Sequence, residues 1–263
     1  MAALDVNTFR DAMLADFDEL ARTVATEQGD WVVKGFIDVY RNIYTVSVDT
    51  KVVSKIIELM LFPVISRFAS ANGYKMVLCD QQNHYPDITF IAPDGTKIAL
   101  DVKSTYRTSS ERVNGFTLGA YTGYFRQRKS TKNATFPYEE YSAHFVLGVI
   151  YTRTEDIPDE RRMYALDELQ DIVSVVTDFA FTLQEKWKIA SDQPGSGNTR
   201  NMGSVKDIAA LLEGKGPFSA YSEAVFDDYW MNYLNADMAR AIDSQVPYHN
   251  LAQYRKWRRK LEL

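Results

Sequence analysis

The chain has 263 residues, of which 46% are hydrophobic and 25% are charged, and its net charge is −5. This composition is ordinary for one globular domain spanning residues 1–263. No apolar run is long enough to span a membrane and no signal peptide opens the chain, so we expect a cytoplasmic protein.

The first 48 residues combine a helical pattern with a strand pattern. Residues 5–26 predict one amphipathic helix, because apolar side chains recur at helical spacing. The members of that face are Phe9, Met13, Phe17 and Leu20. Residues 31–48 are rich in Val, Ile and Tyr, which predicts one or two strands.

A second helix is predicted over residues 49–62. Asp49 or Thr50 can cap its first turn, and Pro63 should end it. The apolar side chains expected to face the core are Val52, Ile56, Leu59 and Met60. The opposite stripe is polar and includes Lys51, Ser54, Lys55 and Glu58. Taken alone, Glu58 is most simply an exposed partner of Lys55 or Ser54 on the same helix.

A β-hairpin is predicted over residues 87–105. Pro93-Asp94-Gly95 separates two β-rich runs, and such a tripeptide favours a turn. If the turn closes between Ala92 and Thr96, strict pairing places Asp87 opposite Asp101. Alternation along the strand then puts Lys103 on the face of Asp101.

Two carboxylates and a lysine at one point suggest chemistry on a phosphate. Neighbouring carboxylates repel unless a cation lies between them, and hard oxygen ligands suit Mg²⁺. A lysine beside them can hold a phosphate or act on the attacking water. A solvated hairpin with unrelated surface charges is the alternative.

The rest of the chain completes an α/β pattern, in which helices flank a central mixed sheet. The predicted elements are a polar loop over 108–114, a buried strand over 145–152, strand signals over 179–190, a loop over 192–200, and helices over 205–213 and 219–243. The single cysteine, Cys79, excludes an internal disulfide, and the three histidines lack the spacing of a zinc site.

The charges are unevenly distributed. Residues 105–134 carry six basic side chains against one acid, the last ten residues carry five against one, and the first thirty are acidic. This asymmetry suits a basic cleft with an acidic back, although scattered solubilising charge is the simpler alternative.

Two loops could contact a nucleic acid. The segment Gly195-Ser196-Gly197-Asn198-Thr199 lacks the Lys-Ser/Thr ending of a nucleotide-binding loop, so no nucleotide cofactor is expected. Its two glycines permit the backbone to approach a ligand surface closely. Asn198 could form a bidentate pair of hydrogen bonds with adenine in the major groove. Amide side chains in residues 81–83 suit the minor groove.

Several stretches together resemble the type II restriction endonucleases of the PD-(D/E)xK superfamily, and the EcoRV-like group in particular. They are Asp49–Val52, Gln81–Asp87, Asp101–Tyr106, Phe116–Gly119, Tyr151–Arg153 and Gly195–Thr199. The resemblance implies a restriction-endonuclease-like fold and a homodimer that cleaves double-stranded DNA with Mg²⁺, or with Mn²⁺ in its place. It further implies the palindrome GATATC, cut to blunt ends with 5′-phosphate and 3′-hydroxyl products.

The same resemblance assigns roles to individual residues. It implies that Asp87, Asp101 and Lys103 are catalytic, that the two aspartates bind metal, and that Glu58 is an accessory catalytic and metal residue. The implied DNA contacts are Gln81, Gln82, Asn83, Lys51, Thr105, Thr117, Lys132, Gly195, Gly197, Asn198, Thr199 and Arg200. Arg200 departs from the family pattern, which puts phosphate or flanking contacts there in doubt.

We expect a dimerisation region over about residues 1–48, because residues 31–48 are rich in aromatic and β-branched side chains and the acidic first helix can support them, and a DNA-binding and catalytic core over 49–263. Two alternatives remain open. A repair or junction-resolving nuclease would share the three catalytic residues but would not need the two reading loops. A DNA-binding module without catalysis would not need the intact set of Asp87, Asp101 and Lys103.

Overall fold

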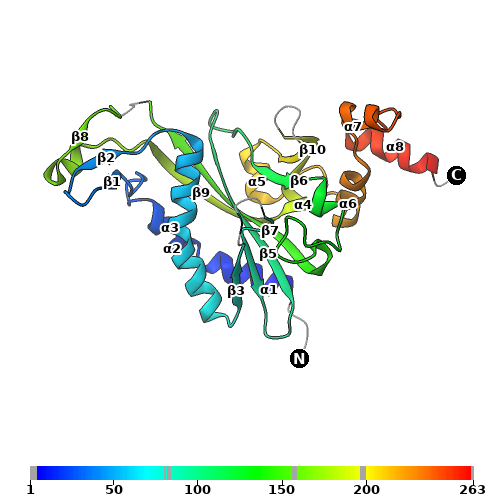
Figure 1. The fold of residues 1–263 in the computed structure, drawn as a ribbon, viewed down its shortest axis with the longest axis horizontal. Coiled ribbons are helices and arrows are strands. Elements are labelled where there is room, and N and C mark those ends of the chain that lie inside the picture. The colour runs from blue at the N-terminus through cyan, green and yellow to red at the C-terminus, as the bar shows by residue number, and fades with distance from the viewer. Residues whose placement is uncertain (1–4, 80, 82–83, 156–158, 196–199, 262–263) are drawn as a thin grey trace.

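A five-stranded mixed sheet forms the centre of the computed structural model, which describes residues 5–79, 81, 84–155, 159–195 and 200–261 (Figure 1). Its strands are β3 (Lys75–Leu78), β4 (Ile88–Ile91), β5 (Lys97–Tyr106), β7 (Tyr141–Arg153) and β9 (Val176–Glu185). They lie in the order β3-β4-β5-β7-β9, with β5 parallel to β7 and all other neighbours antiparallel. The predicted α/β fold with a central mixed sheet is confirmed.

One face of the central sheet is covered by the first three helices. These are α1 (Val6–Ala15), α2 (Phe17–Val24) and α3 (Thr50–Ala71). Alternate residues of β5 and β7, among them Leu100 and Leu147, belong to the same buried apolar cluster as these helices. The strands therefore bury their apolar side chains as the alternation predicts.

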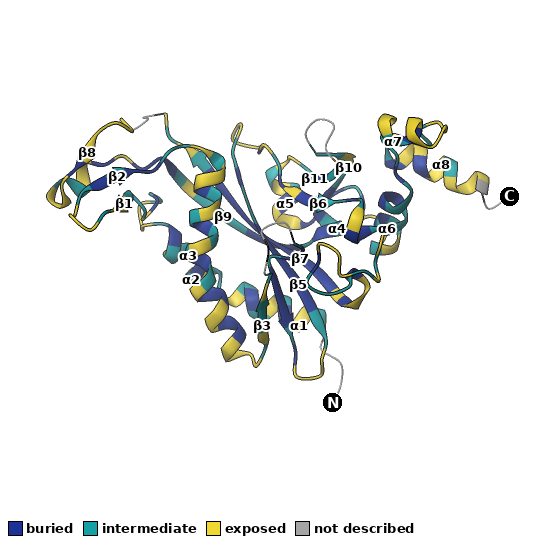
Figure 2. Cartoon of the chain, viewed as in Figure 1, coloured by how far each residue is buried: buried dark blue, intermediate teal, exposed yellow. Residues whose placement is uncertain are grey.

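The other face carries a second sheet and the C-terminal helices. The sheet has the order β10-β11-β6, and the short helix α4 joins β9 to β10. The bounds of these elements are β6 (Thr117–Ala120), α4 (Lys186–Ile189), β10 (Ala190–Pro194), β11 (Asn201–Ser204), α5 (Ile208–Glu213), α6 (Glu223–Asn232), α7 (Ala236–Ala241) and α8 (Leu251–Leu261). Figure 2 shows the central strands buried between the two layers.

A small three-stranded sheet projects from one end of the molecule (Figure 1). It has the order β1-β2-β8, formed by Gly35–Ile37, Ile43–Thr45 and Met163–Tyr164. The strand pattern of residues 31–48 is thus confirmed as two short strands. Trp31, by contrast, is fully buried in the main core.

The single helix predicted over residues 5–26 is wrong, because the chain forms two helices that meet at Asp16. The Asp16 backbone N–H donates to the carbonyls of Met13 and Leu14, which closes α1, and α2 begins at the next residue. The change of direction lets both helices bury their apolar side chains, with Phe9 on α1 and Leu20 on α2 fully buried.

Pro63 does not end the helix that Asp49 caps. The Asp49 carboxylate accepts from the N–H groups of Lys51 and Val52, as predicted, but α3 continues to Ala71. A proline inside a helix costs about 3 kcal/mol. The turns beyond it bury Val64, Ile65, Phe68 and Ala69, and each large apolar side chain buried gains about 1.5–3 kcal/mol. Packing therefore outweighs the proline.

The core-facing side of α3 is also rotated from the predicted one. Val52 and Leu59, predicted to face the core, are exposed, whereas Val53, Ile57 and Leu61 are buried. Apolar residues occupy both sets of positions, so the sequence pattern alone could not choose between them.

The C-terminal region is more divided than predicted. The helix expected over 219–243 is interrupted at the extended Tyr233, and Asn235 caps α7 by accepting from the N–H of Met238. The helix α8 was not predicted. None of the helices described is long and apolar enough to cross a membrane.

Candidate active site

The β4–β5 hairpin brings Asp87 and Asp101 together. Ile88 pairs with Leu100 and Ile91 with Lys97, so the predicted register is confirmed. The N–H of Asp87 donates to Oδ1 of Asp101 at 3.2 Å, and the N–H of Val102 donates to Oδ2 of Asp87 at 2.9 Å. The backbone thus fixes both carboxylates at one end of the hairpin.

Lys103 lies between these carboxylates. Its Nζ is 2.9 Å from Oδ2 of Asp87 and 3.7 Å from Oδ1 of Asp101. Burial lowers the pKa of Lys103, but the negative charges of Asp101 and Asp87 raise it by more than burial lowers it. The pKa of Lys103 therefore lies above its ordinary value. A lysine with a raised pKa stays protonated at neutral pH, so it suits orienting water or phosphate better than accepting a proton.

The Asp87 carboxylate is costly to charge in the absence of another cation. Burial raises the pKa of Asp87, and the negative charge of Asp101 raises it further, while Lys103 opposes both. Asp101 is almost completely buried, with its side chain 5% exposed. A divalent cation beside these oxygens would relieve the repulsion.

The donor set fits Mg²⁺ held mainly by water and substrate. Among the described residues, no group of three or more His, Cys, Asp or Glu side chains is placed to hold a metal ion. The carboxylates that could hold an ion at this point are those of Asp87 and Asp101, which lie together and are hard oxygen donors. Mg²⁺ commonly binds through one or two carboxylates, keeps several waters and takes further ligands from phosphate.

Glu58 lies beside the site but is paired elsewhere. Its carboxylate forms an ion pair of 2.7 Å with Lys55, the exposed arrangement that helical spacing alone favours. Its negative charge nevertheless helps raise the pKa of Lys103, so it lies within electrostatic range. The helix α3 is also joined to β5 here, because the Ser54 and Ser104 hydroxyls are 2.7 Å apart. The accessory role of Glu58 stays a prediction.

The side chains of Asp87, Asp101 and Lys103 line a hollow of about 410 Å³. It is lined by His84, Tyr85, Asp87, Asp101, Lys103, Thr117, Gly119, Ala120, Tyr124 and Asn201. Two further hollows, of about 310 and 560 Å³, share Thr117 with it. The first of these is lined by Lys51 and Thr105, and the second by Gly195. The structure therefore aligns several predicted DNA contacts along one groove.

Other predicted contacts lie at the margins of this groove or outside the described residues. Gln81, Lys132 and Arg200 are exposed, and Lys132 precedes Ala134, which pairs with Tyr85 through a β-bridge. Thr105 is buried, and its Oγ1 has no hydrogen-bond partner in the described part of the chain, so its hydroxyl is enclosed in the floor of its hollow. Predicted contacts outside the described residues are Gln82, Asn83, Gly197, Asn198 and Thr199.

Sequence reasoning did not single out Tyr85, Tyr124 or Asn201 as lining residues. Tyr85 lies inside the motif that ends at Asp87, so its position two residues before a catalytic candidate was a usable signal. Tyr124 carries no local signal, because it lies far along the chain from Tyr85, on which its ring stacks with centroids 4.7 Å apart. Asn201 directly follows Arg200 at the start of β11.

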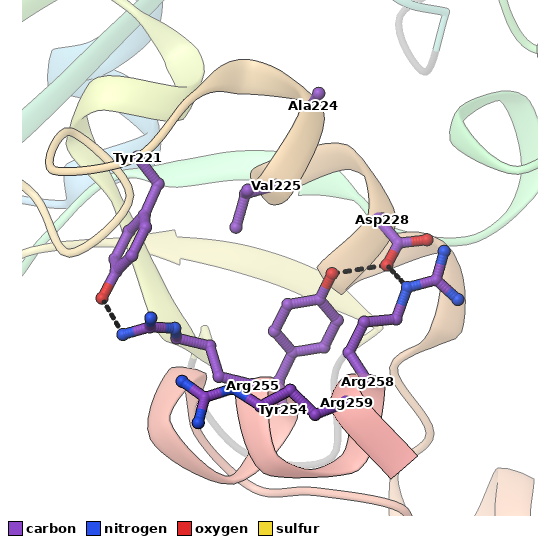
Figure 3. A pocket seen from close by; sticks show the side chains of 8 residues that line it. All are labelled: Tyr221, Ala224, Val225, Asp228, Tyr254, Arg255, Arg258 and Arg259. Atoms are coloured by element: carbon purple, nitrogen blue, oxygen red, sulfur yellow. Dashed lines mark hydrogen bonds and ion pairs between the residues drawn. The ribbon is translucent and has the colours of Figure 1, made fainter. Parts of the chain in front are cut away.

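A separate basic hollow of about 420 Å³ lies between α6 and α8 (Figure 3). Three arginines line it against one carboxylate, that of Asp228, which Arg258 contacts at 3.2 Å. The start of α8 is held against β10, because the N–H of Leu251 donates to Asp192 at 3.0 Å. The basic C-terminal segment is therefore an ordered helix attached to the base of the glycine-rich loop, and its excess positive charge can attract phosphate.

Two comparisons with known proteins show what this chain is similar to. A family model described as "Restriction endonuclease EcoRV" matches residues 27–259. The chain is 38% identical over 242 residues to a protein named "Type II restriction enzyme EcoRV" from Escherichia coli, a match that covers 91% of this chain and 96% of that protein.

Proposed function

This chain belongs to the EcoRV family of type II restriction endonucleases, and we propose that it acts in the cytoplasm as a Mg²⁺-dependent homodimer cutting GATATC to blunt ends. Membership of the family makes it a site-specific deoxyribonuclease, with double-stranded DNA as its substrate. The observation that supports the proposal most is the convergence of Asp87, Asp101 and Lys103 in a groove lined by predicted phosphate contacts.

In the proposed reaction, Asp87 and Asp101 hold the divalent ion, and Mn²⁺ can replace Mg²⁺. The ion supplies positive charge at the scissile phosphate. Lys103, protonated between the carboxylates, orients the attacking water or a phosphate oxygen. The water oxygen bonds to phosphorus and loses a proton to solvent, while the bond to the 3′ oxygen breaks and that oxygen takes up a proton. The products carry 5′-phosphate and 3′-hydroxyl ends.

The DNA contacts divide into positioning and reading contacts. We assign Lys51, Thr117 and Lys132 to phosphates, because a basic or hydroxyl side chain can bind a phosphate without reading sequence. Thr105 keeps the same assignment only if its enclosed hydroxyl becomes accessible. Arg200 is exposed beside the glycine-rich loop and is assigned to a phosphate or a flanking base. We assign base reading to the two loops, from Gln81 to Asn83 and from Gly195 to Thr199.

A digest of sequenced DNA with Mg²⁺ tests the proposed target. We expect blunt ends at GATATC, because the residues of both loops match the family pattern. Asn198→Ala should lose about 1–3 kcal/mol of discrimination at an adenine, since a bidentate pair is worth that much. Sequencing the ends of the fragments is the measurement. Staggered ends, or cutting at an unrelated site, would contradict the proposed specificity while leaving the family assignment intact.

The proposed dimer contact uses the projecting β1-β2-β8 sheet. Within the dimerisation region predicted for residues 1–48, Val39 is 89% exposed and Tyr40 is 83% exposed, and Phe36 and Ile37 beside them are also largely exposed. Met163 adds an exposed apolar side chain from β8. Exposed apolar side chains gathered on one surface are typical of an interaction site. A two-fold dimer would present each loop once to each half of a palindrome.

We expect Val39→Glu combined with Tyr40→Glu to convert the dimer into a folded monomer with little double-strand cleavage. Both side chains already face solvent, so the fold should tolerate the charges, whereas a paired interface should not. Light scattering at micromolar concentration, with and without DNA, is the measurement. Ile242→Glu, at an exposed apolar position after α7, is the control and should remain dimeric. A monomeric wild-type protein under both conditions would refute the dimer.

A further inference from the structure

Lys186, the first residue of α4, is buried beneath the candidate active site. Its side chain is 1% exposed, and its Nζ has no hydrogen-bond partner among the described residues. Burial lowers its pKa to about 8, although the negative charge of Asp101 opposes this shift. The side chain therefore remains largely an ammonium ion at neutral pH.

Such a group is unfavourable for folding by itself. A buried charge without a hydrogen bond loses its hydration and gains little in return. A methionine of similar length would fill the same space without that penalty. A packing role alone therefore does not explain a lysine at this position.

The contacts of the ammonium lead to the catalytic hairpin. Nζ lies 3.9 Å from the centroid of the Tyr85 ring and 5.6 Å from that of Tyr138. An ammonium over the face of an aromatic ring is attracted to it, most strongly when both are desolvated. Tyr85 is itself buried and is the second residue before Asp87.

Tyr85 is held on several sides, so its position controls its neighbours. Its hydroxyl is 2.7 Å from Nδ1 of His144, and its ring stacks on Tyr124. Its backbone N–H donates to Asn133 and its carbonyl accepts from Thr135. Burial lowers the pKa of His144 well below its ordinary value, and the charge of Lys186 adds to this, so the imidazole remains neutral. Lys186 therefore supplies the cation in this cluster nearest to the Tyr85 ring.

We propose that Lys186 is a positioning residue for DNA cleavage, whose ammonium fixes the Tyr85 ring and thereby the Pro86–Asp87 segment that carries one carboxylate of the catalytic pair. This inference rests on the proposed cleavage function. The lysine does not touch the reacting atoms, and it acts through Tyr85. Small displacements of a catalytic group are enough to lower a rate strongly, by about 10²-fold for about 1 Å.

The test compares Lys186→Met with the wild-type protein in three measurements. We expect the single-turnover cleavage rate with Mg²⁺ to fall by about ten- to a hundredfold. DNA affinity in Ca²⁺ should stay within about threefold, because the groove side chains are unchanged. The denaturant midpoint should stay equal or rise, because the unpaired charge is gone. Lys186→Gln, which is also neutral, provides the same readout if the methionine variant does not fold.

Three further variants make the test specific. Lys186→Arg keeps the charge and should recover part of the rate. Lys188→Met, on the same helical turn but ion-paired with Glu185, should cleave like the wild type. In a Tyr85→Leu background, Lys186→Met should have little additional effect, because the ring through which it acts is absent.

Two results would overturn the inference. One is a Lys186→Met protein that cleaves at the wild-type rate. The other is a loss of activity that its unfolded fraction accounts for, which would make Lys186 a purely structural residue. Neither result would contradict the proposed function, which fails only if the wild-type protein itself does not cleave DNA.

Discussion

Asp87→Ala and Asp101→Ala are each expected to lower Mg²⁺-dependent cleavage by at least about 10³-fold, because a bound metal supplies several kcal/mol of charge stabilisation. Each substitution removes one of the two carboxylates that the structure offers to an ion. Both proteins should still unfold cooperatively, because removing one of two repelling buried carboxylates relieves a strain on the fold. Plasmid cleavage and denaturant unfolding, measured side by side, test both expectations.

Lys103→Ala is expected to abolish cleavage for a different reason and with a different effect on stability. It leaves Asp87 and Asp101 close together without the ammonium that contacts both. The protein should therefore be less stable than either aspartate variant at neutral pH, and added Mg²⁺ should restore much of the difference. Asp94→Asn, in the turn of the same hairpin, is the matched control and should cleave normally. Cleavage within about tenfold of the wild-type rate in either aspartate variant would remove the basis of the assigned site.

Removal of divalent ions is expected to abolish cleavage and to weaken specific DNA binding. Two carboxylates near a phosphate repel it until a cation lies between them. Ca²⁺ should restore binding without cleavage, because it accepts irregular geometry and activates water poorly, while Mn²⁺ should support cleavage. Fluorescence anisotropy in EDTA and in Ca²⁺, together with plasmid cleavage in each ion, provides the measurement.

The pH dependence of metal binding follows from the raised pKa of Asp87. Protons compete with the ion for this carboxylate, so Mg²⁺ affinity should fall as the pH is lowered through the raised pKa. Without the ion, the sign for folding is the opposite. Charging Asp87 costs more in the folded than in the unfolded chain. The folded state is therefore stabilised while Asp87 is protonated, and this stabilisation is lost as the pH rises through the pKa that Asp87 has in the folded chain. Mg²⁺ should therefore stabilise the protein more at pH 8 than at pH 5.

For the prediction on removal of divalent ions, fast cleavage in EDTA would rule out the proposed mechanism.

The sequence by itself determined the features that depend on neighbours along the chain. The Pro-Asp-Gly turn set the hairpin register, and strand alternation then placed Asp101 and Lys103 on one face and Leu100 on the other. Asp49 marked the start of α3 because its carboxylate caps the next turn. These interactions are local, so their residues are close together in sequence as well as in space.

Other features were decided by tertiary structure alone. The low helix preference of proline would end α3 at Pro63, but the helix continues to Ala71 because burial of the turns beyond Pro63 in the core outweighs that preference. Glu58 pairs with Lys55 on its own helix, and only the packing of α3 against β5 brings its charge into electrostatic range of Lys103. The contact of Lys186 with Tyr85 joins residues 101 positions apart in the chain. No sequence periodicity reports such a pair, because only the tertiary packing brings the start of α4 against the segment that precedes β4.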